Sequence, residues 1–238
     1  MGSSARCHSA SRRVPCRQVP ARQRAPAGAS TSGRPPFSNP TEITNPLFPI
    51  GSTDQAVQLG AGGDVALRHE ITFLDETRVV RWNGQDIEAV VSQFVAYGDG
   101  EILETATDYF AQADDGSVWY LGEDVTNYNG GRVENHDGIW LAGRDGPAGM
   151  IMLADPQVGD VYRPENIPGF VFEEVTVQQT GLTVDGPTGP VGGAILVQER
   201  LMDGTLEDKG VRARLRRVLR QRPDPRRAGH RRRSGAHR

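Results

Sequence analysis

Residues 37–209 contain no cysteine, because the two cysteines of this 238-residue chain are Cys7 and Cys16. A fold in this stretch therefore does not depend on disulfides, and cysteine usage indicates no redox compartment. The chain also lacks a run of 18 or more apolar residues, which excludes a transmembrane helix. Residues 9–20 contain arginines where the apolar part of a signal peptide would lie, so we expect no signal peptide in the sequence as written.

Lysine is absent from both ends of the chain, where arginine is abundant. Residues 1–36 carry 7 arginines and no acidic residue, and residues 210–238 carry 12 arginines and one acidic residue. The 173 residues between them carry 8 basic and 29 acidic side chains, a formal charge of −21 that the net charge of −3 conceals. Basic ends can contact nucleic acid. Arginine without lysine is, however, also what GC-rich DNA encodes in a wrong reading frame, so we expect no nucleic-acid partner.

The composition predicts three segments: a disordered segment over 1–36, a domain over 37–209 and a disordered tail over 210–238. The two ends hold too few large apolar residues to offset the entropy of ordering them. When residues 211–218 are back-translated and shifted by one base, they read Tyr-Ala-Pro-Gly-Phe-Gly-Glu, which would continue a β domain well. We therefore hypothesise that the tail after Lys209 is a frameshift product and that residues 1–36 are a mis-called start. Resequencing the gene tests both.

Alternating apolar and polar residues predict short strands through the middle segment, since strand side chains point to opposite faces in turn. Asn-Gly and Asp-Gly pairs, which favour tight turns, separate these runs. Residues 87–97 also fit helical spacing, but their β-branched and aromatic content favours a strand. The expected strands are 65–73, 78–82, 87–97, 101–113, 118–121, 139–141, 150–153, 170–178 and 195–202, the last of them. We expect an all-β fold, an antiparallel meander that forms a sandwich or a partly closed barrel, with residues 37–50 as an ordered lead-in along it.

Acidic residues gather around the turn expected at Asp114 and Asp115. If the flanking strands form one hairpin, Asp108 and Glu123 lie on its two arms and several carboxylates converge. Close carboxylates repel one another and favour a cation or a shared proton, and Ca²⁺ takes such oxygen ligands. The pattern therefore offers a Ca²⁺ site, although no EF-hand spacing is present. The alternative is that Asp-Gly makes turns and the other acids cover solvated faces.

Aromatic residues in the expected strands suggest a second kind of site. A curved antiparallel sheet holds small apolar molecules on its concave face. The side chains that would line such a pocket are Tyr109, Trp119, Tyr120, Trp140 and Met152. The alternative is an ordinary core. His69 stands in phase with apolar strand residues and is expected to be a satisfied core histidine.

Signatures of common catalytic or cofactor sites are missing. We find no zinc-binding spacing of His and Cys, no Gly-x-Ser-x-Gly elbow, no Walker loop and no dinucleotide fingerprint. Paired acids beside tryptophans also suit glycoside hydrolysis, but no spacing in the sequence sets two acids at the required separation. We therefore expect no cofactor, with Ca²⁺ as the alternative.

Three stretches carry a resemblance to a known group of sequences. They are Asn39-Pro40 with Ile43 to Pro49; Asp108-Tyr109 with Ala111-Gln112 and Val118 to Glu123; and Trp140 with Ala142-Gly143, Asp145-Gly146, Gly149 and Glu165. The chain resembles a family of uncharacterised bacterial proteins that usually begin with a secretion signal. The resemblance implies secretion or a cell-envelope location. The family usually continues from the final lysine with a Tyr-Ala-Pro-Gly-like segment, unlike residues 211–238 here.

The best functional reading is a non-enzymatic, secreted or cell-envelope β module that binds a small ligand or Ca²⁺. The first alternative is a hydrolase that uses acids among Asp108, Asp114, Asp115 and Glu123. The second is a purely structural domain. A hydrolase should show two inward-facing acids of raised pKa in a cleft, whereas a binding module should show a ligand-dependent melting temperature.

Overall fold

The computed structural model describes residues 35–50, 54–186 and 189–211, and for residues 210 and 211 it describes the backbone alone. These residues form strands and turns but no helix. The strands are β1 (Gln55–Gly62), β2 (Val65–Trp82), β3 (Gln85–Gly98), β4 (Glu101–Gln112), β5 (Val118–Asn129), β6 (Arg132–Asn135), β7 (Trp140–Leu141), β8 (Gly149–Met152), β9 (Val161–Ile167), β10 (Val171–Gly186), β11 (Gly189–Leu201) and β12 (Leu206–Val211). The expected all-β fold is confirmed.

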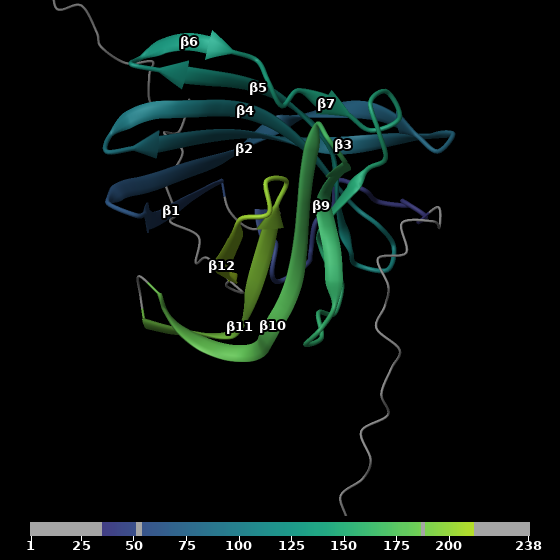
Figure 1. Cartoon of the computed structure of the whole chain (residues 1–238). Coiled ribbons are helices and arrows are strands. Elements are labelled where there is room, and N and C mark those ends of the chain that lie inside the picture. Colours follow the sequence, from purple (N-terminus) through teal and green to yellow (C-terminus); the bar gives the residue numbers. More distant parts are fainter. Residues whose placement is uncertain (1–34, 51–53, 187–188, 212–238) are drawn as a thin grey trace, which may run out of the picture.

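The strands form two antiparallel sheets. The larger sheet has eight strands, with β1 to β6 in sequence order and β7 and β8 both paired to β5. The smaller sheet has four strands in the order β12-β11-β10-β9. In Figure 1 the sheets lie close together on the right and diverge toward the left. No strand pairing joins the two sheets within the described ranges, so they do not close into a barrel.

Several strands are longer than the sequence pattern predicts. Residues 65–73 and 78–82 belong to one strand, β2, because its pairing with β3 continues across an irregularity between Phe73 and Thr77. The strand expected at 118–121 continues to Asn129, and those expected at 170–178 and 195–202 continue into β10 and β11. The added parts of β10 and β11 contain several glycines and pair with register shifts, so their strand signal in the sequence is weaker than that of the packed parts. The strand expected over 87–97 is confirmed as β3.

The pattern also missed strands at 55–62, 132–135 and 161–167. The prediction that 195–202 is the last strand is wrong, since Asp203-Gly204 makes a turn into β12. Asn83-Gly84 and Asp99-Gly100 make the turns expected of them. All four residues have positive φ, between 50° and 85°, as tight hairpin turns require.

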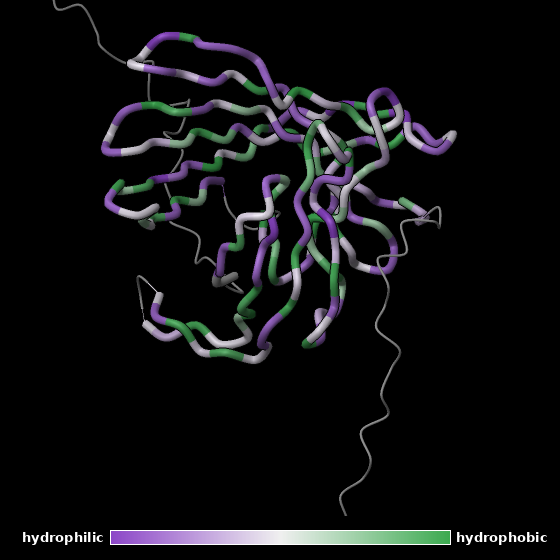
Figure 2. Tube along the Cα trace, viewed as in Figure 1, coloured by the Kyte–Doolittle hydropathy of each residue, from purple (hydrophilic) through white to green (hydrophobic). Residues whose placement is uncertain are grey.

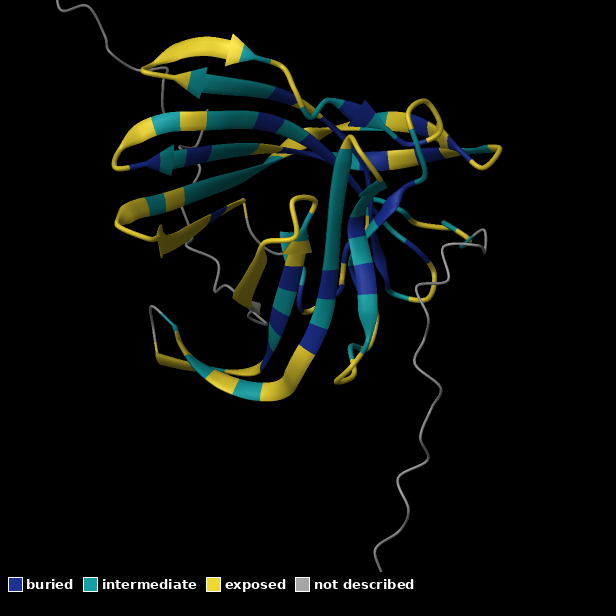
Figure 3. Ribbon diagram, in the orientation of Figure 1, coloured by how far each residue is buried: buried dark blue, intermediate teal, exposed yellow. Residues whose placement is uncertain are grey.

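The hydrophobic core lies where the two sheets approach each other. It combines residues of the larger sheet, such as Leu121 and Trp140, with Val175, Val177 and Val197 of the smaller one. Hydrophobic and hydrophilic residues alternate along the strands (Figure 2), and buried positions concentrate on the side where the sheets meet (Figure 3). The diverging strand ends are largely exposed. The molecule is therefore packed at one end and open at the other.

Two glycines allow strands to approach unusually closely. A Cβ on Gly122 would meet the carbonyl oxygen of Trp140, and a Cβ on Gly149 would overlap the carbonyl oxygen of Pro164. Gly122 also has φ +135°, which side chains rarely tolerate. Gly122 thus lets β7 pair with β5, and Gly149 lets β8 lie against β9 of the other sheet.

Residues 35–50 lie along the end of the β4–β5 hairpin, which confirms the ordered lead-in. The buried Asn45 donates from Nδ2 to the carbonyl oxygens of Gly116 and Leu153, each at 2.9 Å. Gln112 accepts from the backbone amides of Thr44 and Asn45. The lead-in therefore satisfies backbone groups that the hairpin end would otherwise leave unpaired.

Most of the segments assigned as disordered, 1–36 and 210–238, lies outside the described residues. Strand β12 extends to Val211, two residues into the segment assigned to the tail. Within the described ranges, no helix is long and apolar enough to cross a membrane.

Candidate functional site

Asp108 and Glu123 face each other across strands β4 and β5, where they are register partners. Both are almost fully buried, with 7% and 9% of their surface exposed. Asp108 accepts a hydrogen bond from the hydroxyl of Tyr120 on Oδ1 at 2.8 Å and one from Ser92 Oγ on Oδ2 at 3.3 Å. The hairpin thus carries two carboxyl groups side by side on its inner face.

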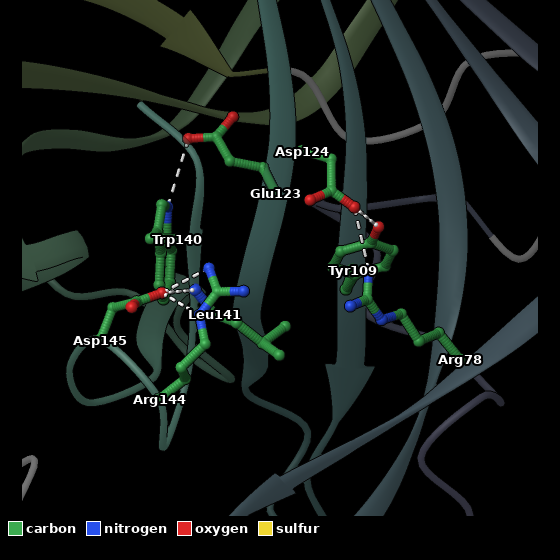
Figure 4. A network of polar contacts seen from close by, with 8 residues as sticks. All are labelled: Arg78, Tyr109, Glu123, Asp124, Trp140, Leu141, Arg144 and Asp145. Atoms are coloured by element: carbon green, nitrogen blue, oxygen red, sulfur yellow. Dashed lines mark hydrogen bonds and ion pairs between the residues drawn. The ribbon is translucent and has the colours of Figure 1, made fainter. Parts of the chain in front are cut away.

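Glu123 connects the larger sheet to the smaller one. The indole Nε1–H of Trp140 donates to its Oε1 at 3.2 Å, as Figure 4 shows. Glu123 also shares a hydrogen bond with Glu165, which lies on β9. A hydrogen bond between two carboxyl groups requires that one of them keep its proton. Burial and the neighbouring carboxyl accordingly raise the pKa of Glu123, and burial raises that of Glu165.

The protonation of Asp108 is shifted in the same way. Burial, followed by the charge of Glu123, raises its pKa to about 7, although the hydrogen bonds from Tyr120 and Ser92 oppose the shift. Burial also raises the pKa of Glu104, four residues back on β4. In the described part of the chain, no arginine or lysine forms an ion pair with any of these acids. The interior therefore holds a group of carboxyls with no counter-charge.

A second group of acids lies on the smaller sheet. Lys209 of β12 forms ion pairs with Glu199, with Glu173 at 3.8 Å and with Glu207 at 3.9 Å. Burial and the hydrogen bond with Glu199 raise the pKa of Glu173. Glu173, Glu199 and Glu207 thus share one lysine as counter-charge. Asp108, Glu123, Glu165 and Glu104 have no such partner among the described residues.

His69 lies beside these groups and away from the packed core. It is half-buried on β2, with its ring 5.1 Å from that of Phe94. Burial, followed by the positive charge of Lys209, lowers its pKa. The charge of Lys209 on the smaller sheet therefore acts on His69 of the larger sheet, so the two diverging sheets are electrostatically coupled at this point.

The four acids predicted as a metal site separate into two places. Asp108 and Glu123 lie together, but Asp114 and Asp115 lie at the hairpin turn. Asp114 accepts from the amide and hydroxyl of Ser38, at 2.7 and 2.8 Å, and Asp115 accepts from Ser117. These two aspartates hold the turn and the lead-in. Among the described residues, no group of three or more His, Cys, Asp or Glu has a geometry suited to a metal ion.

The residues predicted to line an apolar pocket are all buried, and the three that belong to the hairpin lie on both of its faces. Tyr120 and Trp140 meet edge to face at 5.3 Å beside the carboxyl group. On the opposite face, Trp119 packs against Trp82 at 5.2 Å. Tyr109 also lies on that face, and Met152 is buried in the core with the others. Neighbouring strand residues point apart, and the one ring contact within this set joins Tyr120 and Trp140.

Sequence reasoning missed Glu165, Glu173 and Glu199 as members of the site. Glu173 is in phase with the buried Val175 and Val177. Glu199 is in phase with Val197 in the same way. A glutamate in phase with core residues could therefore have indicated these site members in the sequence, because charged residues are rarely buried unless they are paired.

No family model, curated protein or solved structure matches this chain.

Proposed function

We propose that this protein is a binding module that holds a small, positively charged organic ligand between its two sheets. The observation that carries the proposal is the convergence of Asp108, Glu123 and Glu165, from both sheets, with no described lysine or arginine paired to them. Perturbed carboxyls of this kind are concentrated at functional sites. A bound cation would supply the missing counter-charge.

The energetic cost of the arrangement supports this reading. Buried carboxyls without a counter-charge destabilise a fold, and apolar residues at the same places would pack better. The same carboxyls stabilise the folded protein when a ligand supplies the opposite charge. The fold then gives up stability when empty and recovers it on binding.

The surroundings favour an organic cation over a metal ion. Tyr120 and Trp140 present aromatic rings next to the acids, and aromatic rings attract ammonium groups. Glu104, Glu165 and Glu173 are only half-buried, so part of the group is accessible from outside. Ca²⁺ prefers six to eight oxygen ligands in one shell, which the described acids do not form.

Thermal melting of the full chain tests the proposal. The probes are choline, spermidine and CaCl₂ at pH 8.5 and pH 5.5, each compared with NaCl at matched ionic strength. An organic cation should raise the melting temperature more at pH 8.5, because the acids must be ionised to bind it. Asp108→Asn and Glu123→Gln should each reduce this effect, and the matched control Asp114→Asn should not.

If neither choline nor spermidine shifts the melting temperature beyond the NaCl control at pH 8.5, the proposal fails. A shift with CaCl₂ alone would instead support the Ca²⁺ reading. A shift that persists unchanged in both Asp108→Asn and Glu123→Gln would place the ligand elsewhere.

A hydrolase is the second candidate, and the pairing of Asp108 with Glu123 favours it. A carboxyl whose pKa is about 7 can act as a general acid near neutral pH, and two facing carboxyls are what glycoside hydrolysis uses. The low exposure of both residues counts against access by a substrate. Release of nitrophenol from nitrophenyl glycosides, lost in both Asp108→Asn and Glu123→Gln, would support this candidate instead.

The location of the protein belongs to the same proposal. The family resemblance implies secretion or the cell envelope. Fractionation of the source cells tests this, and detection in the cytosol alone would contradict it.

A further inference from the structure

The larger sheet has a second candidate site on the face that points away from the smaller sheet. A pocket of about 340 Å³ lies there, at the small end of the range for small-molecule sites. Its floor comes from three neighbouring strands, because Thr107 is the register partner of both Gln93 on β3 and Asp124 on β5. Thr105 and Thr126 are partners in the same way, one step along the sheet. Register partners point to the same face, so these side chains form one polar surface.

The connection after β6 forms the wall of the pocket. His136 and Ile139 of this connection line it. Nδ1 of His136 lies 2.9 Å from the carbonyl oxygen of Val125 and 3.2 Å from Oγ1 of Thr126. A carbonyl oxygen only accepts, so Nδ1 carries the hydrogen and Nε2 of the neutral ring keeps its lone pair. The imidazole is thereby held in one orientation, and its Nε2 has no hydrogen-bond partner among the described residues.

Asp124 is held in place from the other side. Its Oδ2 accepts a hydrogen bond from the hydroxyl of Tyr109 and pairs with Arg78 at 3.0 Å, as Figure 4 shows. The guanidinium of Arg78 also lies over the ring of Tyr109, 4.3 Å from its centre. Oδ1 of Asp124 has no hydrogen-bond partner among the described residues. The pocket therefore presents a fixed carboxylate oxygen whose charge Arg78 already balances.

Apart from Thr126, the remaining polar side chains of the pocket are uncharged and have no hydrogen-bond partner among the described residues. The side chains of Gln93, Thr105 and Thr107 make no hydrogen bond to another described residue, and both threonines are half-buried. A hydroxyl both donates and accepts, and an amide offers two donors and one acceptor. Ile139 adds an apolar contact. This is the lining that suits a neutral ligand with several hydroxyl groups on a small ring.

We propose that this pocket binds a neutral sugar, either a monosaccharide or the terminal residue of a glycan. Oδ1 of Asp124 and Nε2 of His136 accept from sugar hydroxyls. The threonine hydroxyls and the amide of Gln93 complete the contacts. The site lies on the opposite face of the hairpin from Asp108 and Glu123, so it is independent of the cation site proposed above.

Proton–nitrogen NMR of the full chain tests the proposal. The probes are glucose, galactose, mannose and N-acetylglucosamine, with tetramethylammonium chloride and sodium acetate as charged comparisons. At least one sugar should produce saturable shifts at residues 105–107, 124–126 and 136. Small polar ligands in an open pocket bind weakly, so titrations should reach about 100 mM.

Variants locate the binding. Thr107→Val removes the hydroxyl but keeps the shape and strand preference of the side chain, so the sheet should fold unchanged. Loss of one hydrogen bond should weaken binding about 3- to 10-fold. Thr105→Val is the second variant. Thr176→Val, on strand β10 of the other sheet, is the matched control, and Asp108→Asn should also leave sugar binding unchanged.

Three results would overturn the proposal. The first is the absence of saturable shifts with every sugar. The second is the same affinity in Thr107→Val and Thr105→Val as in the unaltered chain. The third is saturation at these residues by tetramethylammonium or acetate without a comparable response to any sugar.

Discussion

Replacing Asp108 with asparagine should stabilise this protein at pH 8. Asparagine keeps the shape of aspartate and its two hydrogen bonds. Its Oδ1 still accepts from the hydroxyl of Tyr120, and its amide donates to Ser92 Oγ. What it removes is a carboxylate that the folded protein buries without a counter-charge.

The magnitude follows from the pKa of Asp108, which rises from its ordinary value of 3.8 to about 7 on folding. The folded protein therefore holds this proton more tightly than the unfolded chain does. Its contribution to stability is complete below about pH 4 and is lost as the pH rises through about 7. The difference corresponds to about 4 kcal/mol in total, of which roughly 2–3 kcal/mol is lost between pH 5 and pH 8.

Urea and thermal unfolding at pH 5 and pH 8 measure the effect. Asp108→Asn should raise the melting temperature at pH 8 by about 5–12 °C and reduce the loss of stability between the two pH values. Asp114→Asn is the control. Bonds from Ser38 lower the pKa of the exposed Asp114, so its replacement should not stabilise the protein at pH 8.

The reasoning is refuted if Asp108→Asn is no more stable than the unaltered chain at pH 8 and keeps the same dependence on pH. Some dependence should remain in either case, because burial also raises the pKa of Glu123 and Glu165. The same variant should weaken the binding of a cationic ligand. Higher stability with lower affinity would be the expected signature of a binding group.

Three further changes test other parts of the structure. Gly149→Ala should lower the free energy of unfolding by more than about 3 kcal/mol, because its Cβ would overlap the backbone of Pro164. Urea unfolding measures this loss, and a near-neutral change would contradict the close contact. Lys209→Met should raise the pKa of His69, because it removes the positive charge that lowers it, and NMR titration of the imidazole ring measures the change. An unchanged pKa would show that the charge of Lys209 on β12 does not act on β2. Asn45→Ala should lower the free energy of unfolding by about 2–3 kcal/mol in thermal unfolding, since it removes the donor of two part-buried carbonyl groups. An unaffected melting temperature would show that the lead-in does not support the hairpin.

The sequence predicted two of the four acids of the proposed metal site at the place where the structure has the buried carboxyl pair. Asp108 and Glu123 were chosen because acids cluster around one hairpin, and the register of β4 and β5 does bring them together. Asp114 and Asp115 were grouped with them because the sequence spacing is short. A strand rises about 3.4 Å per residue, however, so residues at a turn lie well away from a pair in the middle of the arms. Nearness along the chain was not nearness in space.

The aromatic residues illustrate the same limit. Tyr109, Trp119 and Tyr120 were predicted to share one surface, but consecutive strand residues alternate between faces. A register shift between Tyr109 and Phe110 changes which residues of β5 stand opposite those of β4. Patterning alone does not reveal such a shift.

The sequence by itself determined the fold class and many of the turns, since period-two alternation and Asn-Gly or Asp-Gly pairs are local signals that need no distant partner. It also contained an unused signal for Glu173 and Glu199, which are acids at positions in phase with core residues. Only the tertiary structure decided that Glu165 of β9 meets Glu123 of β5, and that Asp124 on the same strand points to a pocket on the other face. These contacts join residues far apart in the chain, and they depend on the register and the crossing of two sheets, which arise from packing and not from local preference.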